Sequence, residues 1–203
     1  MGLIRNIRKG FMFLRGGPGI APEDAALVTR YLNDAERAAF FGMDPPDQAH
    51  SLRVTRHCEE ALKAYPELDE RSMMKAALLH DIGKTGAGLG LTFRTFWVLS
   101  HKFAPELLDR IARRGERARP RSLRRKLYVQ VAHAAIGAAM LAQTGTEEEV
   151  RDLVYCTGEY CEPNDPLEKW LLLSADADRV LTPEREAQWR GETKPSPERE
   201  RGA

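Results

Sequence analysis

Cysteine is scarce in this sequence, which contains only Cys58, Cys156 and Cys161 among 203 residues. Their number is odd and no two are spaced as CxxC, so neither a disulfide framework nor a structural zinc site is expected. Long apolar runs are missing as well, and the N-terminal residues lack a signal-peptide core. These features predict a cytoplasmic protein.

An excess of charge of one sign is also missing, because the formal net charge is only +1 and 42% of the residues are hydrophobic. This composition argues against disorder and against a protein coated in nucleic acid. No segment shows the sustained alternation of a β-strand, so the sequence predicts an all-α bundle in one domain. Capping-box patterns mark two helix starts, Asn33 with Glu36 and Thr146 with Glu149. Helical spacing covers residues 22–32, 34–41, 48–64, 70–82, 94–112, 122–143, 147–155 and 166–181.

Two potential metal ligands, His80 and Asp81, adjoin at the end of the apolar segment 76–84, AALLHDIGK. An apolar helix seldom ends by chance in such a doublet, followed by Gly83, which lets the chain turn, and Lys84, which can meet an anion. The combination predicts a metal-dependent site for phosphate esters, in which Asp81 and Lys84 are the candidate catalytic residues.

The doublet needs further ligands, because a catalytic ion usually has three or more from the protein. His50 lies upstream in a predicted helix whose N-cap we expect to be Asp47. Asp176 lies downstream, at the end of an apolar run where a buried carboxylate requires a cation. His50, His80, Asp81 and Asp176 therefore form a predicted set of two nitrogen and two oxygen ligands.

This order of motifs, His, then His-Asp, then a distant Asp, resembles the HD superfamily of metal-dependent phosphohydrolases. The resemblance covers roughly residues 47–180 and looks closest to the small bacterial HD hydrolases that include symmetric diadenosine tetraphosphate hydrolases. In that branch an additional His opens a helix written HGPVGA, and residues 133–138, HAAIGA, are similar. The resemblance implies that His133 is a candidate ligand for a second metal ion.

The sequence departs from that branch at residues 154–158, VYCTG, where the branch has one more His before the last Asp. Cys156 is a poor replacement beside hard oxygen ligands. We therefore predict one tightly held ion, with a second weak or absent, and we do not transfer the dinucleotide substrate. The mixed donors favour Mn, Fe, Co or Ni over Mg.

The predicted activity is hydrolysis of a nucleotide or another phosphate ester by metal-activated water, with Lys84 and Arg53 contacting the phosphate. A non-catalytic HD-type regulator, which keeps the metal for structure or ligand sensing, is the alternative. His57 lies on nearly the same helical face as His50, and His101 lies outside the matched motifs. We expect both to be structural histidines.

We expect the chain to be organised into a helical extension (1–46), an HD domain (47–181) and a charged, disordered tail (182–203). Residues 3–15 form a basic amphipathic stretch, for which packing on the domain or a partner is favoured over membrane contact. Residues 110–126 contain nine Arg or Lys and one acid, Glu116. We expect a solvated connector there, since no aromatic residues are interleaved for base stacking, and nucleic acid is not an expected partner.

Overall fold

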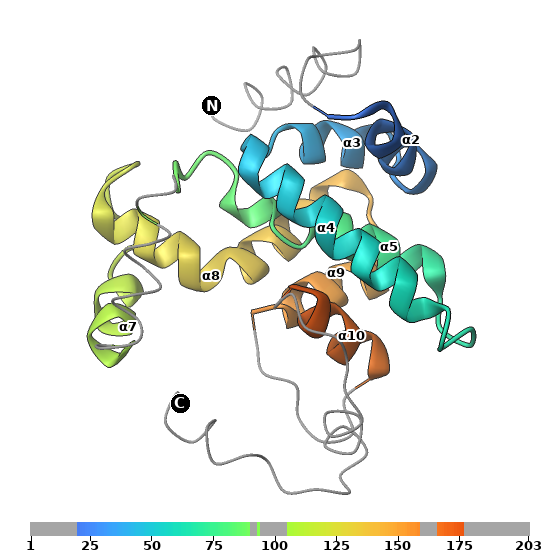
Figure 1. The fold of residues 1–203 in the computed structure, drawn as a ribbon. Coiled ribbons are helices and arrows are strands. Elements are labelled where there is room, and N and C mark those ends of the chain that lie inside the picture. The colour runs from blue at the N-terminus through green and yellow to red at the C-terminus, as the bar shows by residue number, and fades with distance from the viewer. Residues whose placement is uncertain (1–19, 90–92, 94–104, 159–165, 177–203) are drawn as a thin grey trace, which may run out of the picture.

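The computed structural model describes residues 20–89, 93, 105–158 and 166–176, and this part of the chain is helical with no β-strand (Figure 1). The predicted all-α fold is therefore confirmed. Its helices are α2 (Pro22–Tyr31), α3 (Asp34–Phe41), α4 (Pro45–Leu62), α5 (Glu70–Leu79), α7 (Pro105–Arg113), α8 (Leu123–Leu141), α9 (Glu148–Cys156) and α10 (Leu167–Asp176), with short 3-10 helices η1 (Ile82–Lys84) and η2 (Ala142–Thr144).

Helix α5 is the centre of the bundle. Every residue from Ser72 to Leu79 is buried, and α5 packs against α2, α3, α4, α9 and α10. Its side chains join those of Val28, Phe40 and Leu172 in one apolar core. Because full burial of a large apolar side chain is worth about 1.5–3 kcal/mol, this core holds the end of α5 in a fixed position.

A second, smaller core lies between α7 and α8, where Leu108 and Ala112 meet Leu127. Helix α8 runs from this cluster towards the larger bundle and also contacts η1 and α9 (Figure 1). It therefore connects the two apolar clusters, and its middle passes beside the turn that follows α5.

The predicted capping box of α3 is confirmed, because Asn33 Oδ1 accepts from the amide of Glu36 and Glu36 returns a hydrogen bond to the amide of Asn33. The second predicted box is wrong. Helix α9 has Glu147 at its N-cap, and the Thr146 hydroxyl donates to Glu36 Oε1 at 2.9 Å instead. Glu36 is fully buried, and a buried carboxylate without a donor costs more free energy than an uncapped helix end that water can reach.

The start of α4 also differs from the prediction. Asp44 is the N-cap residue, Pro45 and Pro46 occupy the first turn, and Asp47 is a buried residue inside the helix. Proline suits the first helical positions, because the amides there have no intrahelical partner in any case. His50 consequently lies in the second turn of α4, one turn further along than expected.

A buried ion pair joins the N-terminal helices to the bundle. Lys75 on α5 lies 2.8 Å from Glu36 of α3 and also pairs with Glu147 before α9, and its side chain is only 3% exposed. The triad connects three segments that are far apart in the sequence, so it fixes their relative positions.

Several predicted features lie outside the described residues: the segment 3–15, His101, most of the predicted helix 94–112, and the tail 182–203. Among the helices that are described, none has both the length and the apolar character needed to cross a bilayer.

Candidate metal centre

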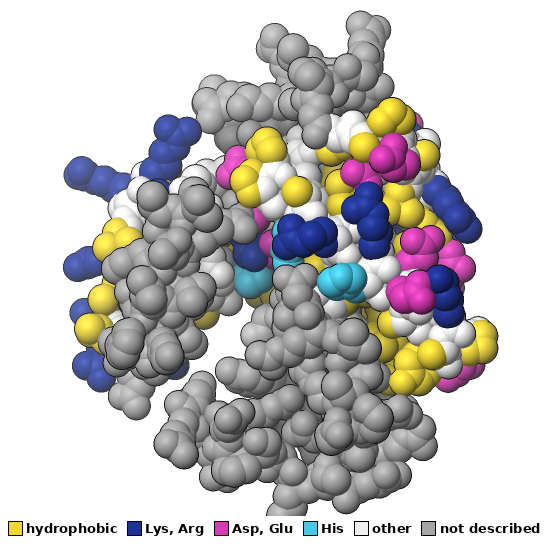
Figure 2. Space-filling model, viewed as in Figure 1, with side chains coloured by type: hydrophobic (Ala, Val, Ile, Leu, Met, Phe, Trp, Pro, Cys, Tyr) yellow, Lys and Arg dark blue, Asp and Glu magenta, His cyan; other side chains and the backbone are white. Residues whose placement is uncertain are grey.

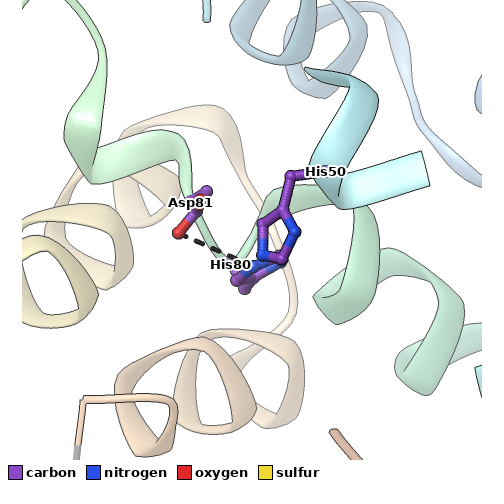
Figure 3. A group of neighbouring side chains, drawn as sticks. All are labelled: His50, His80 and Asp81. Carbon is purple, nitrogen blue, oxygen red and sulfur yellow. Dashed lines mark ion pairs between the residues drawn. The ribbon is translucent and has the colours of Figure 1, made fainter. Parts of the chain in front are cut away.

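Three of the predicted ligands meet where α4 passes the end of α5. His50 projects from α4 towards His80, while His80 and Asp81 follow directly after α5 (Figure 3). Each offers one ligand atom, and these atoms all lie within 4.8 Å of one another. The rings of His50 and His80 are 5.3 Å apart and meet edge to face. The histidine from α4 and the doublet after α5, 30 positions apart in the sequence, thus form one group.

The turn after α5 brings Asp81 into this group. The helix was predicted to continue to Ile82, but it ends at Leu79, with His80 as the C-cap residue. Asp81 follows with φ −94° and ψ 4°, in the sparsely occupied bridge region where many active-site residues lie. This break turns the carboxylate of Asp81 away from the helical path.

The imidazole of His80 is oriented by the backbone. Its Nδ1 lies 2.9 Å from the carbonyl oxygen of Ala77, and that carbonyl can only accept, so Nδ1 carries the proton. The neutral ring then has its lone pair on Nε2, which lies 3.6 Å from Asp81 Oδ1. A hydrogen bond from one ring nitrogen that directs the other is the usual arrangement of a metal-ligating histidine.

His133, on α8, repeats this arrangement from the other side of Asp81. Its Nδ1 lies 2.8 Å from the carbonyl oxygen of Gln130, and its Nε2 lies 3.7 Å from Asp81 Oδ1. Burial, with the nearby Lys84 ammonium, lowers the pKa of His133 to about 4 although Asp81 opposes the shift. At neutral pH the ring is therefore uncharged, which is the form that binds metals.

Asp81 stays ionised in spite of its burial. Burial raises the pKa of its carboxyl group, but the Lys84 ammonium and, at the low pH where the carboxyl group titrates, the protonated rings of His80 and His133 outweigh that effect and bring the pKa to about 2. Lys84 Nζ lies 2.6 Å from Oδ1. Asp81 Oδ2 is buried, and no residue in the described part of the chain donates a hydrogen bond to it.

This donor set fits a divalent cation. The two separations between imidazole nitrogen and carboxylate oxygen, 3.6 and 3.7 Å, are too long for hydrogen bonds. They are close to the spacing of about 3.4 Å between two ligands that each lie about 2.1 Å from a tetrahedral ion. A buried carboxylate with an oxygen that accepts no hydrogen bond is costly unless a cation meets it.

A close contact between two glycines brings η1 against α8. A Cβ atom on Gly83 would lie 1.9 Å from the carbonyl oxygen of His133 and 2.8 Å from the amide of Gly137. A Cβ on Gly137 would in turn come within 3.3 Å of the amide of Gly83. At Gly83 only a residue without a side chain allows this approach, which places Asp81 beside His133.

A family model described as the HD domain matches residues 48–182, about two thirds of the sequence. The chain belongs to the HD domain family. HD domains are typically metal-dependent hydrolases, so the family and the His50, His80 and Asp81 group together indicate a divalent metal ion. No curated protein and no solved structure matches the sequence.

The remaining candidate ligands either have side chains outside the described residues or lie apart from this group. Asp176 is the last residue of α10, which packs against α4, but its side chain lies outside the described residues. His57 is exposed on α4, and Cys156 is the half-buried last residue of α9. Neither belongs to the ligand group found among the described side chains.

Arg53 lies beside the candidate ligands, one turn after His50. Its Nη2 is 3.2 Å from His50 Nδ1, and the side chain is exposed. Figure 2 shows histidine side chains next to Lys and Arg side chains in the middle of the face where α4 lies. Sequence reasoning missed the glycine pair that aligns η1 with α8, although the spacing of His133 and Gly137 in HAAIGA was its signal.

Proposed function

We propose that this HD-domain protein is a metal-dependent phosphohydrolase that cleaves a nucleotide or a related phosphate ester. The observation that carries the proposal is the buried, ionised Asp81, which has the Nε2 atoms of His80 and His133 at 3.6 and 3.7 Å and the Lys84 ammonium at 2.6 Å. Two imidazoles, a carboxylate and an ammonium suit the binding of a cation next to a phosphate anion.

The proposed ligands are His50, His80, Asp81 and Asp176, with His133 as a candidate for a second position. When bound, a divalent ion lowers the pKa of a water ligand and polarises a phosphoryl oxygen. Its donors, imidazole nitrogen and carboxylate oxygen, favour Mn, Fe, Co or Ni over Mg. The absence of a histidine at Cys156 supports one tightly held ion.

Lys84 and Arg53 are the proposed phosphate contacts. The Lys84 side chain is only 12% exposed, and its ammonium is fixed by the ion pair with Asp81. A phosphate beside Asp81 would therefore meet a cation already in position. Arg53 is exposed at the outer side of His50 and can donate two parallel hydrogen bonds to a phosphate. These two cations would hold the negative charge of the substrate.

The proposed assignment to the branch of small bacterial HD hydrolases rests on the segment HAAIGA, residues 133–138. The tertiary contact between Gly83 and Gly137 supports it, because it gives the glycine of this segment a specific role. The dinucleotide substrate of that branch is not transferred, since Cys156 stands in a segment where a metal-binding histidine occurs in the branch.

The test is a screen of metal-loaded protein against nucleoside mono-, di- and polyphosphates and dinucleotides. The His80→Ala and Asp81→Ala variants should lose both metal retention and hydrolysis, while their circular dichroism spectra stay helical. His57→Ala, an exposed histidine of α4, is the matched control and should keep both. Elemental analysis measures the metal separately from turnover.

The outcome distinguishes the enzyme from an HD-type regulator. Metal that is bound by the native protein and lost in the two variants, without turnover of any substrate in the panel, would favour the regulator. Full metal occupancy in the double variant would refute the assignment of the site. Loss of the helical signal on removal of the metal would show that the ion is structural.

A further inference from the structure

The end of α7, the following turn and the first turn of α8 carry a concentration of arginine. We call residues 110–126 of this region the arginine hairpin. Figure 2 shows Lys and Arg side chains on the side of the molecule where α7 and the start of α8 lie. The exposed members are Arg110, Arg113, Arg114, Arg117, Arg119, Arg121 and Arg124.

These arginines differ from Arg30 and Arg56, which are exposed as well but have carboxylate partners. Arg30 pairs with Glu70 and Arg56 pairs with Asp24. Within residues 20–89, 93, 105–158 and 166–176, no carboxylate forms an ion pair with any of the seven exposed arginines of the hairpin. The described residues therefore leave their positive charge uncompensated.

The backbone of the hairpin is packed against α8, while most of its arginine side chains are exposed, as expected for a solvated segment. A Cβ on Gly115 would lie 2.2 Å from the carbonyl oxygen of Arg124, so the turn rests directly on α8. Ser122 caps α8 by accepting from the amide of Arg125, whose guanidinium donates to the carbonyl of Glu116 and lies over the Tyr128 ring. Arginines on such a support lose less freedom when they bind a ligand.

The composition of the patch selects the class of anion. Only Lys126 among the nine basic residues is not arginine. Arginine is the preferred residue for phosphate groups, because its planar fork donates two parallel hydrogen bonds. Many such groups spread over a helix, a turn and a second helix suit a chain of phosphates better than a single one.

A membrane surface fits the hairpin less well. Leu108 and Ala112 of α7 are buried against α8. Among the described residues of α7 and the hairpin, Leu107 and Leu123 are the large apolar side chains left exposed, and two leucines among seven arginines are a smaller apolar surface than the continuous face with which an interfacial helix enters a bilayer. Base stacking is also unsupported, because Tyr128 is partly buried under Arg125. Among the described residues, the hairpin therefore offers contacts to phosphates and no exposed aromatic side chain for base stacking.

We infer that the arginine hairpin binds nucleic acid through the phosphate backbone, without sequence preference. The inference is independent of the hydrolytic role of the metal centre. His133 lies ten residues along α8 from the first residue of that helix, about 15 Å away along its axis. A strand held on the hairpin would thus lie close to the metal centre without occupying it.

Binding is tested on the full chain by the fluorescence anisotropy of labelled RNA and duplex DNA of about 20 nucleotides or base pairs, between about 50 and 200 mM salt. The test variant is Arg113→Gln/Arg117→Gln/Arg124→Gln. The control, Arg30→Gln/Arg56→Gln/Arg71→Gln, removes the same charge from exposed arginines outside the hairpin. Melting temperatures of both variants establish that they are folded.

We expect the affinity of the native chain to fall roughly 100-fold or more over this salt range. The hairpin variant should bind on the order of ten-fold more weakly, with a slope against log salt that is shallower by about 2 to 3. Equal weakening in the control variant would overturn the inference. Binding to phosphatidylserine-containing vesicles, with no binding to RNA or DNA, would also overturn it and assign the surface to membranes.

Discussion

Arg53 directs its guanidinium at Nδ1 of His50, one turn earlier on α4, with 3.2 Å between the nitrogens. A guanidinium can only donate, so Nδ1 accepts and a neutral His50 keeps its proton on Nε2. A metal ion bound through Nδ1 would displace Arg53 directly. Binding through Nε2 would move the proton to Nδ1, which then becomes a donor. In either case a bound metal ion would separate Arg53 from His50 and would make the guanidinium available to a phosphate.

The Arg53→Ala variant should therefore bind its metal ion more tightly and its phosphate substrate more weakly. Loss of one competing hydrogen bond is worth about 1 kcal/mol, which corresponds to an affinity change of about five-fold. Calorimetric titration with Mn²⁺ measures the first effect, and KM for the best substrate measures the second. Arg56→Ala, on the same helix but paired with Asp24, should change neither. Weaker metal binding in Arg53→Ala would contradict this account.

Replacement of Gly83 by alanine should disrupt the contact between η1 and α8. The new Cβ would lie 1.9 Å from a backbone oxygen that cannot move independently, so we expect destabilisation of about 3 kcal/mol or more. Metal affinity should fall as well, because Asp81 would move away from His133. Urea denaturation and metal titration measure the two effects.

Gly88→Ala is the matched control for this substitution. Gly88 has φ +65° and no atom within 4 Å of an added Cβ. Its replacement should cost only the strain of a left-handed residue, about 1 kcal/mol. Equal destabilisation by the two substitutions would mean that the Gly83 contact is not specific.

The metal-free protein should lose stability between about pH 6.5 and pH 4 through His133. The pKa of His133 is lowered from 6.5 to about 4, so in this window the unfolded chain takes up a proton that the folded chain does not. Stability therefore rises with pH there, and at pH 5 the loss is about 2 kcal/mol. His133→Gln should remove this part of the pH dependence, as measured by denaturation at pH 5 and pH 7.5. An unchanged difference between the two pH values in His133→Gln would show that other groups cause it.

Lys75→Met should destabilise the protein strongly, because it leaves the buried Glu36 without its cation. Removal of one partner from a buried ion pair typically costs about 3–5 kcal/mol. The double variant Lys75→Met/Glu36→Gln should recover much of the loss, since no uncompensated charge then remains inside. Lys63→Ala, which removes an exposed pair with Glu60, should leave the melting temperature unchanged. A double variant less stable than Lys75→Met would show that packing, and not charge, dominates.

The sequence by itself determined the helical fold and the residue types of the candidate centre. Apolar spacing along α4, α5 and α8 follows from the period of a helix, and the doublet of His80 and Asp81 is visible as adjacent letters. The capping box of Asn33 and Glu36 was also predictable, because its hydrogen bonds join residues three positions apart. Local interactions of this kind depend only on neighbouring residues.

Only the tertiary structure decided where α5 ends, which partner Thr146 takes, and which histidines surround Asp81. Helix α5 ends at Leu79 because the chain must turn for Gly83 to meet α8. Thr146 does not cap its helix because its hydroxyl donates to the buried carboxylate of Glu36, 110 positions away. A helix cap is worth about 1 kcal/mol, whereas an unsatisfied buried charge or a backbone clash costs several times more. These larger energies arise between segments far apart in the sequence, so local patterns could not reveal them.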